Sequence, residues 1–307
     1  MKTLTDITTF REYGSVATIG FFDGVHLGHR FLLNELKETA VRKNRKTLVI
    51  TFDNHPRATL QNGYLPLLLT TNEEKISLLD NAGIDACLML PFTEEMASCT
   101  ASAFFETILH KQLQIDTLLT GYDHRFGKNR TESLDDYLQY GKRWGIQVET
   151  AGFYSEKENR LSSSYIRELL QQGDVAKANH LLGYRYGIQG EVVKGLNIGK
   201  RIGFPTANLS LLDNRKLLPA RGVYAVSVSV KGKSYKGMLN IGYRPTIGNS
   251  DEKNVEVHIL NFNENIYSER VEVFFVDKIR EEKHFKTIEE LILQLEKDRD
   301  FLETKSV

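Results

Sequence analysis

The first half of the chain alternates candidate strands with amphipathic stretches, and this alternation restricts the fold more than any other feature. Strands are expected at Val16–Gly20, Thr47–Phe52, Ala86–Leu90, Thr117–Thr120 and Gln147–Thr150. Helices are expected between them at His29–Arg42, Asn72–Asn81, Ala101–Gln112 and Glu132–Trp144. This order predicts an α/β domain, a parallel sheet covered on both faces, with ligands bound beyond the carboxyl ends of its strands.

The pattern changes to period-two runs at about Leu182–Gly187. Strands are expected at Gly187–Val193, Gly222–Val230, Tyr235–Ile241, Val255–Phe262 and Arg270–Asp277. They predict an antiparallel domain, a small closed β-barrel. A final helix is expected at Thr287–Leu302, with a Thr287–Glu290 capping box and an apolar stripe that packs against the barrel. We therefore expect one domain at residues 1–183 and another at 184–307.

The segment GFFDGVHLGH, residues 20–29, lies at the first expected turn from strand to helix. Gly20, Gly24 and Gly28 let the backbone bend and approach a ligand, and the N-terminus of the following helix attracts an anion. His26 and His29 stand one turn apart, where two imidazoles can donate hydrogen bonds to one phosphate. An ordinary turn with a capping histidine is the alternative, and no Glu or Cys nearby completes a metal site.

Three further polar segments follow expected strands: TFDNHP at 51–56, GYDHRFGKNR at 121–130 and SSSYIRELL at 162–170. Because the carboxyl ends of parallel strands meet at one edge, we expect these segments to converge on His26 and His29. Singly, each has an ordinary explanation as a turn, a solvated basic loop or a serine-capped helix start.

In the second half, GLNIGKRIGFPTANL at 195–209 is poor strand sequence and predicts a loop that folds over a ligand. Thr206 and Asn208 offer oxygen ligands suited to a hard cation such as magnesium. Glu256 interrupts an apolar strand and shares a face with His258. If it points inward it is a candidate general base. If it points outward it belongs to the polar face of an edge strand. For residues 195–209, an ordinary long surface loop is the alternative.

Composition limits the class of protein. The 307 residues include 41% hydrophobic residues, and 40 basic residues balance 40 acidic ones. This balance argues against a generic nucleic-acid or membrane surface, and no apolar run has the length of a signal peptide or membrane span. We expect a cytoplasmic protein, a monomer or weak homo-oligomer, with Cys87 and Cys99 as buried thiols.

These motifs resemble the prokaryotic bifunctional riboflavin kinase/FMN adenylyltransferases, the FAD synthetases. The first domain carries GFFDGVHLGH, TFDNHP, GYDHRFGKNR and LSSSYIR, and the second carries GKRIGFPTANL, PARGVYAV, NIGYRPTIG and VEVHILNF. The resemblance implies a Rossmann-like nucleotidylyltransferase domain followed by a riboflavin kinase-like barrel. It also implies two reactions: phosphorylation of riboflavin to FMN by ATP, and transfer of AMP from ATP to FMN, which gives FAD and pyrophosphate.

The same resemblance implies roles for individual residues. In the first domain, His26, His29 and Arg167 align the reacting phosphates, and in the barrel Glu256 is the base. The implied nucleotide and phosphate ligands are Gly20, Phe22, Asp23, Gly24, Gly28, Ser163, Ser164, Gly199, Lys200, Gly203, Pro205 and Thr206. The implied flavin contacts are His55, Asp123, Arg125, Phe126 and Arg244. Thr206 and Asn208 are the implied ligands of Mg²⁺.

The chain departs from the family pattern at Asn54, His124 and Asn261, where the family has proline, phenylalanine and aspartate. Two alternative functions also stay open. One is a monofunctional kinase or adenylyltransferase that keeps the other domain for stability or binding. The other is a flavin-binding regulator or RNA-associated protein that reuses the fold. Release of pyrophosphate would distinguish a synthetase from a regulator.

Overall fold

A computed structural model describes residues 1–9, 14–55, 67–122, 124–154, 161–195, 198–244 and 252–305. The chain divides into two compact units, Met1–Ser162 and Ser163–Val307. The helices that follow Ser162 therefore pack with the second unit, upstream of the expected functional boundary at residues 183 and 184. That boundary stays a prediction.

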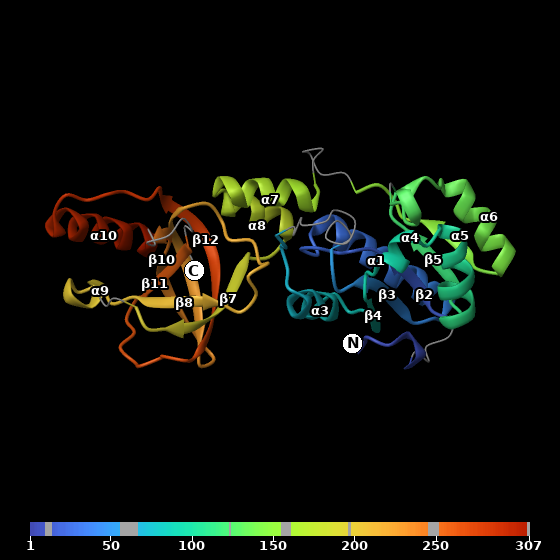
Figure 1. The fold of residues 1–307 in the computed structure, drawn as a ribbon, viewed down its shortest axis with the longest axis horizontal. Helices are drawn as coiled ribbons and strands as arrows, with labels where there is room; N and C mark the ends of the chain where they lie inside the picture. Colours follow the sequence, from blue (N-terminus) through green and yellow to red (C-terminus); the bar gives the residue numbers. More distant parts are fainter. Residues whose placement is uncertain are drawn as a thin grey trace. The chain divides into compact units, whose positions relative to one another are not determined.

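The first unit is built on a six-stranded sheet in the order β1-β4-β3-β2-β5-β6 (Figure 1). Every neighbouring pair in it is parallel. Its strands are β1 (Lys2–Leu4), β2 (Val16–Ile19), β3 (Thr47–Phe52), β4 (Ala86–Leu90), β5 (Thr117–Thr120) and β6 (Gln147–Thr150). The predicted parallel sheet is confirmed. Among the strands that the structure describes in the first unit, only β1, a three-residue edge strand, was not predicted from the sequence.

Helices cover both faces of this sheet. Alternate strand residues point to opposite faces, so Val16 and Val49 pack with Leu36 of α1, whereas Ala17 and Leu48 pack with Phe105 on the other face. The helices of the first unit are η1 (Ile7–Thr9), α1 (Leu27–Lys43), α3 (Asn72–Asn81), α4 (Glu94–Ser98), α5 (Ala101–Phe104), η2 (Phe105–Gln112), η3 (Lys128–Arg130) and α6 (Leu134–Trp144). The expected helix 101–112 is thus a short α-helix that continues as a π-helix, η2.

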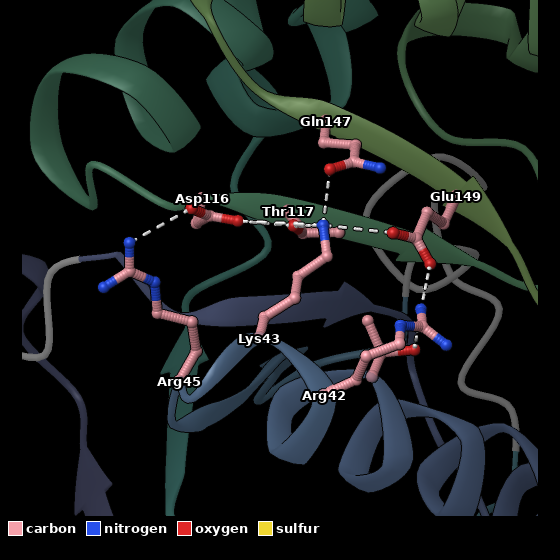
Figure 2. A network of polar contacts seen from close by, with 8 residues as sticks. Arg42, Lys43, Arg45, Asp116, Thr117, Gln147 and Glu149 are labelled. Atoms are coloured by element: carbon pink, nitrogen blue, oxygen red, sulfur yellow. Dashed lines mark hydrogen bonds and ion pairs between the residues drawn. The ribbon is translucent and has the colours of Figure 1, made fainter.

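A polar network ties the C-terminus of α1 to the amino ends of β5 and β6 (Figure 2). The Lys43 ammonium lies 2.6 Å from both Thr117 Oγ1 and Gln147 Oε1, and 3.0 Å from Glu149 Oε1. Arg42 pairs with Glu149, and Arg45 pairs with Asp116. These cations are therefore neutralised, and they lie at the opposite end of α1 from His26.

The second unit begins with α7 (Ser163–Gln172) and α8 (Val175–Leu182) and continues into a closed barrel in the order β10-β11-β8-β7-β12-β9. The barrel strands are β7 (Gly187–Val193), β8 (Ala207–Leu211), β9 (Gly222–Val230), β10 (Lys233–Arg244), β11 (Glu252–Ile259) and β12 (Arg270–Arg280). All pairs are antiparallel, which confirms the predicted barrel.

Two details of the second unit correct the sequence analysis. The expected loop 195–209 is interrupted by α9 (Ile198–Arg201) and runs into β8, because Ala207–Leu211 pairs with both β7 and β11. The final helix α10 (Ile288–Glu303) packs on the barrel through Leu302, Ile292 and Leu295. Ile288, by contrast, is exposed. The Glu290 carboxylate accepts from the Lys286 backbone, so only the Thr287 half of the expected capping box forms.

Candidate functional site

The turn between β2 and α1 has an unusual backbone. Phe22, Val25 and Gly24 all have positive φ angles, of 53°, 34° and 80°. For Phe22 and Val25 this region is strained, and such strain is concentrated at functional sites. A side chain at Gly28 would press on the His26 ring, because a Cβ atom there would lie 3.3 Å from two of its atoms. A Cβ atom at Gly20 would similarly lie 3.0 Å from the Phe22 ring. The two glycines therefore make room for these rings.

His26 and His29 are stacked at the N-terminus of α1. Their ring centroids are 3.7 Å apart with an interplanar angle of 15°. His26 caps the helix, and its Nδ1 accepts from the backbone N–H of His29 at 3.3 Å. Nε2 of a neutral His26 is therefore the protonated nitrogen. His29 Nδ1 is buried and has no hydrogen-bond partner among the described residues.

Burial keeps both imidazoles neutral. It lowers the pKa of His26 to about 4, against a smaller opposing effect of Asp23. It also lowers the pKa of His29 well below its usual value, and the charges of His26, His124 and Lys75 add to this effect. Because neither ring is charged, no counter-ion has to be displaced before an anion binds at this helix N-terminus.

Asp23 fixes the turn to the segment that leads into α3. Its carboxylate is 3% exposed and accepts from the backbone N–H groups of Leu69 and Thr70, both at 3.0 Å, and from the Thr70 hydroxyl at 3.2 Å. The Gly24 N–H in turn donates to the same hydroxyl at 3.1 Å. Asp23 therefore positions the loop, and its expected contact with a nucleotide stays a prediction.

Two other loops of the first unit lie beside this turn. His55, after β3, packs its ring against Phe21 with centroids 4.7 Å apart. His124, after β5, lies close enough to His29 to influence its pKa. The expected convergence on the turn that carries His26 and His29 is therefore confirmed for the loops after β3 and β5. Asn54 is exposed at the end of the described part of its loop.

The other residues of the first unit that are expected to contact the flavin differ in how far they are exposed to solvent. Arg125 is exposed, whereas Phe126 is 9% exposed and stacks on Tyr137 in the core, with centroids 4.7 Å apart. Asp123 lies outside the described residues. Flavin contacts by these three residues stay predictions.

The segment with Ser163, Ser164 and Arg167 forms the first turns of α7, as the sequence predicts. This helix belongs to the second unit by its packing, since the Ala220 N–H donates to the Leu170 carbonyl at 2.8 Å. The expected approach of these side chains to the phosphates in the first unit stays a prediction.

In the barrel, Glu256 lies on β11 opposite Asn208 of β8. Its Oε2 accepts from the Thr206 hydroxyl at 3.3 Å, and its Oε1 accepts from Asn254 Nδ2 at 2.7 Å. Val255 and Val257, on the opposite face of the strand, are buried at 3% and 0% exposure. Glu256 therefore points away from the face that these valines bury, so the expectation of an inward carboxylate is not met. β11 lies between two strands of the closed barrel, so it is not an edge strand either.

The segment before β8 lies against the face of β11 that carries Glu256. His258 Nδ1 donates to the Pro205 carbonyl at 2.7 Å, and its ring packs edge-on against Phe204 at 5.3 Å. A side chain at Gly199 would collide with the Phe204 carbonyl, and Gly203 has a φ of 84°. The side chains of Lys200 and Arg244 lie outside the described part of the chain. Asn261 forms the turn after β11 with a left-handed φ of 56°, which asparagine tolerates.

The donors near Glu256 fit a magnesium–nucleotide complex better than a metal held by protein alone. Thr206 and Asn208 offer neutral oxygens beside one carboxylate. Within the described residues, no cluster of three His, Cys, Asp or Glu side chains could hold a metal ion. Magnesium is commonly bound by one or two protein groups together with substrate phosphates and water.

Two residues that shape the first unit's site, Tyr137 and Lys75, were not predicted from the sequence. The Tyr137 hydroxyl accepts from the backbone N–H of Phe126 at 2.8 Å and donates to its carbonyl at 3.0 Å. Lys75 of α3 is 1% exposed and donates to the Phe52 carbonyl at 2.9 Å. Lys75 lies one helical turn before the buried Leu79, so both face the core. A lysine at a core-facing position of a helix is the sequence feature that could have indicated its role.

Comparison with solved structures supports the fold. A structure from Streptococcus pneumoniae, titled a macrolide-efflux protein, is 30% identical, with a TM-score of 0.91 and 99% coverage of both chains. In our chain, none of the helices that the structure describes combines the length and apolar character needed to cross a bilayer.

Comparison with protein families and curated proteins covers both units. A family model described as FAD synthetase matches residues 9–165, and one described as riboflavin kinase matches residues 182–305. Proteins named bifunctional riboflavin kinase/FMN adenylyltransferase are 38% identical in Haemophilus influenzae, over 93% of this chain and 92% of the relative, and 37% identical in Bacillus subtilis, over 93% and 90%. The chain therefore belongs to the bifunctional riboflavin kinase/FMN adenylyltransferase family.

Proposed function

We propose that Glu256 carries out the first of the two reactions of this enzyme, and His26 and His29 the second. The first reaction makes FMN from riboflavin and ATP, and the second makes FAD from FMN and ATP. Adenylyl transfer is assigned to the turn between β2 and α1. The observation that carries this assignment is the stacked, neutral His26–His29 pair at a helix N-terminus, with His29 Nδ1 buried and not hydrogen-bonded within the described residues.

In adenylyl transfer, an oxygen of the FMN phosphate attacks the α-phosphorus of ATP. The bond from that phosphorus to the bridging oxygen of the β-phosphate breaks, and pyrophosphate leaves. The FMN phosphate is already a competent nucleophile, so the protein mainly aligns the reactants and stabilises charge. Imidazole N–H groups of His26 and His29 and the N-terminus of α1 would donate to the phosphate oxygens. Ser163 and Arg167 would bind the outer phosphates.

In the kinase reaction the nucleophile is a ribityl hydroxyl, which benefits from a base. Glu256 is the proposed base: its carboxylate would take the hydroxyl proton as the oxygen attacks the γ-phosphorus and ADP leaves. The hydrogen bonds from Thr206 and Asn254 hold this carboxylate in place. Gly199, Lys200 and Gly203 would cover the phosphates.

Mg²⁺ is the cation that we propose for the barrel, bound by Thr206 and Asn208 together with the phosphates of ATP. When bound, it would neutralise negative charge on those phosphates. Asn208 is 7% exposed, its side-chain amide lies against Gly195, and its position in β8 is paired with Glu256 in β11.

Point variants test the two assignments separately. His29→Ala is expected to stop FAD formation from supplied FMN while riboflavin phosphorylation continues. Glu256→Gln is expected to do the reverse. His110→Ala and Glu191→Gln, at exposed positions of the first unit and of the barrel, are the matched controls. Wild-type FAD formation by His29→Ala, or wild-type FMN formation by Glu256→Gln, would refute the corresponding assignment.

The oligomeric state, the absence of a nucleic-acid partner and the cytoplasmic location stay predictions. Size-exclusion chromatography with light scattering tests the expected monomer or weak homo-oligomer.

A further inference from the structure

Lys75 is a buried cation beside the adenylyl-transfer site. It lies on α3, and its side chain is 1% exposed. A buried charge is costly unless it has partners. The ammonium donates to the carbonyl of Phe52, the last residue of β3, at 2.9 Å. It also lies 4.1 Å from the centroid of the Phe21 ring, within the range of a cation–π interaction.

These two partners belong to two different loops of the site. Phe21 follows Gly20 in the turn that leads to His26 and His29, and Phe52 precedes the loop that carries His55. The Phe21 ring contacts both the Lys75 ammonium and the His55 ring, whose centroid is 4.7 Å away. The Phe21 carbonyl also accepts from the Thr51 hydroxyl at 3.1 Å. The ammonium of Lys75 thus joins the loop after β2 to the loop after β3.

Lys75 also acts on His29 through its charge. The groups that influence the pKa of His29 are His26 from the helix cap, His124 from the loop after β5 and Lys75 from α3. Asp23 faces His26 and opposes the lowering of its pKa. A positive charge on Lys75 therefore favours the neutral imidazole of His29.

We propose that Lys75 is a positioning residue for FMN adenylylation, which holds Phe21 and the Phe52 carbonyl so that His29 and His55 keep their places. It acts through these residues and does not itself contact the substrate. The proposal rests on the assignment of adenylyl transfer to the His26–His29 pair. It goes beyond that assignment because it gives α3 a part in the reaction.

The central test compares Lys75→Met with the wild-type enzyme. Methionine fills the space of the lysine stem but removes the charge and the donor. We expect kcat/KM for FMN adenylylation to fall about 10- to 100-fold, since small misplacements at an active site have effects of this size. Riboflavin phosphorylation by the barrel of the same chain should be unchanged, which provides an internal control.

The pH profile separates positioning from a merely structural role. Because kcat/KM reports groups of the free enzyme, its acid limb should move to higher pH in Lys75→Met as the pKa of His29 rises. Lys75→Arg keeps the charge and should keep the limb near its wild-type position. Leu79→Ala removes a buried side chain of the same helix and should lower stability without moving the limb.

Each outcome decides the question. A folded Lys75→Met enzyme with wild-type kcat/KM and a wild-type acid limb would overturn the proposal, as would a limb displaced equally in Lys75→Arg. If Lys75→Met does not fold, Lys75→Gln, which keeps a donor for Phe52, takes its place with the same two criteria. His29→Ala identifies a failure of the underlying assignment: FAD formation that survives this change would place adenylyl transfer elsewhere, whatever Lys75 does.

Discussion

At the scale of single residues, His26 couples the chemistry of the first unit to its stability. Burial lowers its pKa from 6.5 to about 4, so folding favours the neutral ring. The resulting stabilisation is complete above pH 6.5 and is lost as the pH falls from there towards 4, because the unfolded chain then binds the extra proton. His29 acts in the same direction.

We predict that the unfolding free energy of the first unit decreases as the pH is lowered through this window. The contribution of His26 is about 1.4 kcal/mol per pH unit. His26→Asn keeps a good helix cap but does not titrate, so its pH dependence should be weaker. Chemical denaturation followed through Trp144, the single tryptophan, measures this. Equal slopes for the variant and the wild type would contradict the account.

Asp23 provides a second prediction at this scale. In Asp23→Asn the amide nitrogen would face backbone N–H groups that now donate to a carboxylate oxygen. Leaving a buried donor without an acceptor costs about 1–3 kcal/mol, and the loss of a charged acceptor adds to this. We expect lower stability of the first unit and weaker FMN adenylylation, with kinase activity intact. Asp136→Asn, in the half-buried capping box of α6, is the control and should leave adenylylation unchanged.

At the scale of elements, α6 holds the loop after β5 through Tyr137. Tyr137→Phe removes the hydroxyl that pairs with both backbone groups of Phe126 and should cost about 1–3 kcal/mol. Because His124 lies in the same loop, we also expect a higher KM for FMN. Steady-state kinetics with supplied FMN test this, with Tyr140→Phe on the same helix as control. A destabilised variant with a wild-type KM for FMN would show that this loop does not contribute to FMN binding.

Much of this architecture can be predicted from the sequence, since hydrophobic periodicity is local. The strands at Thr47–Phe52 and Ala86–Leu90 have the predicted bounds. β8 was missed because its short run follows a glycine- and proline-containing segment, and it is fixed by pairing with β7 and β11. Histidines in a strand–helix turn can be recognised locally. The place of Lys75 depends on a carbonyl 23 residues away, which periodicity does not show.

At the scale of the whole molecule, the central residues of the two proposed sites lie in separate compact units. The His26–His29 pair belongs to the first and Glu256 to the second. Each unit has its own hydrophobic core, so a substitution that lowers one activity should leave the other measurable in the same preparation. FMN is the product of one unit and the substrate of the other.

The most direct test is a chromatographic time course with pure protein, riboflavin, ATP and Mg²⁺. FMN should rise first and then give way to FAD as pyrophosphate appears, and in His29→Ala the reaction should stop at FMN. Accumulation of FMN without FAD in the wild type would contradict the function assigned to the first unit. Untouched riboflavin, with supplied FMN still converted to FAD, would contradict the function assigned to the barrel.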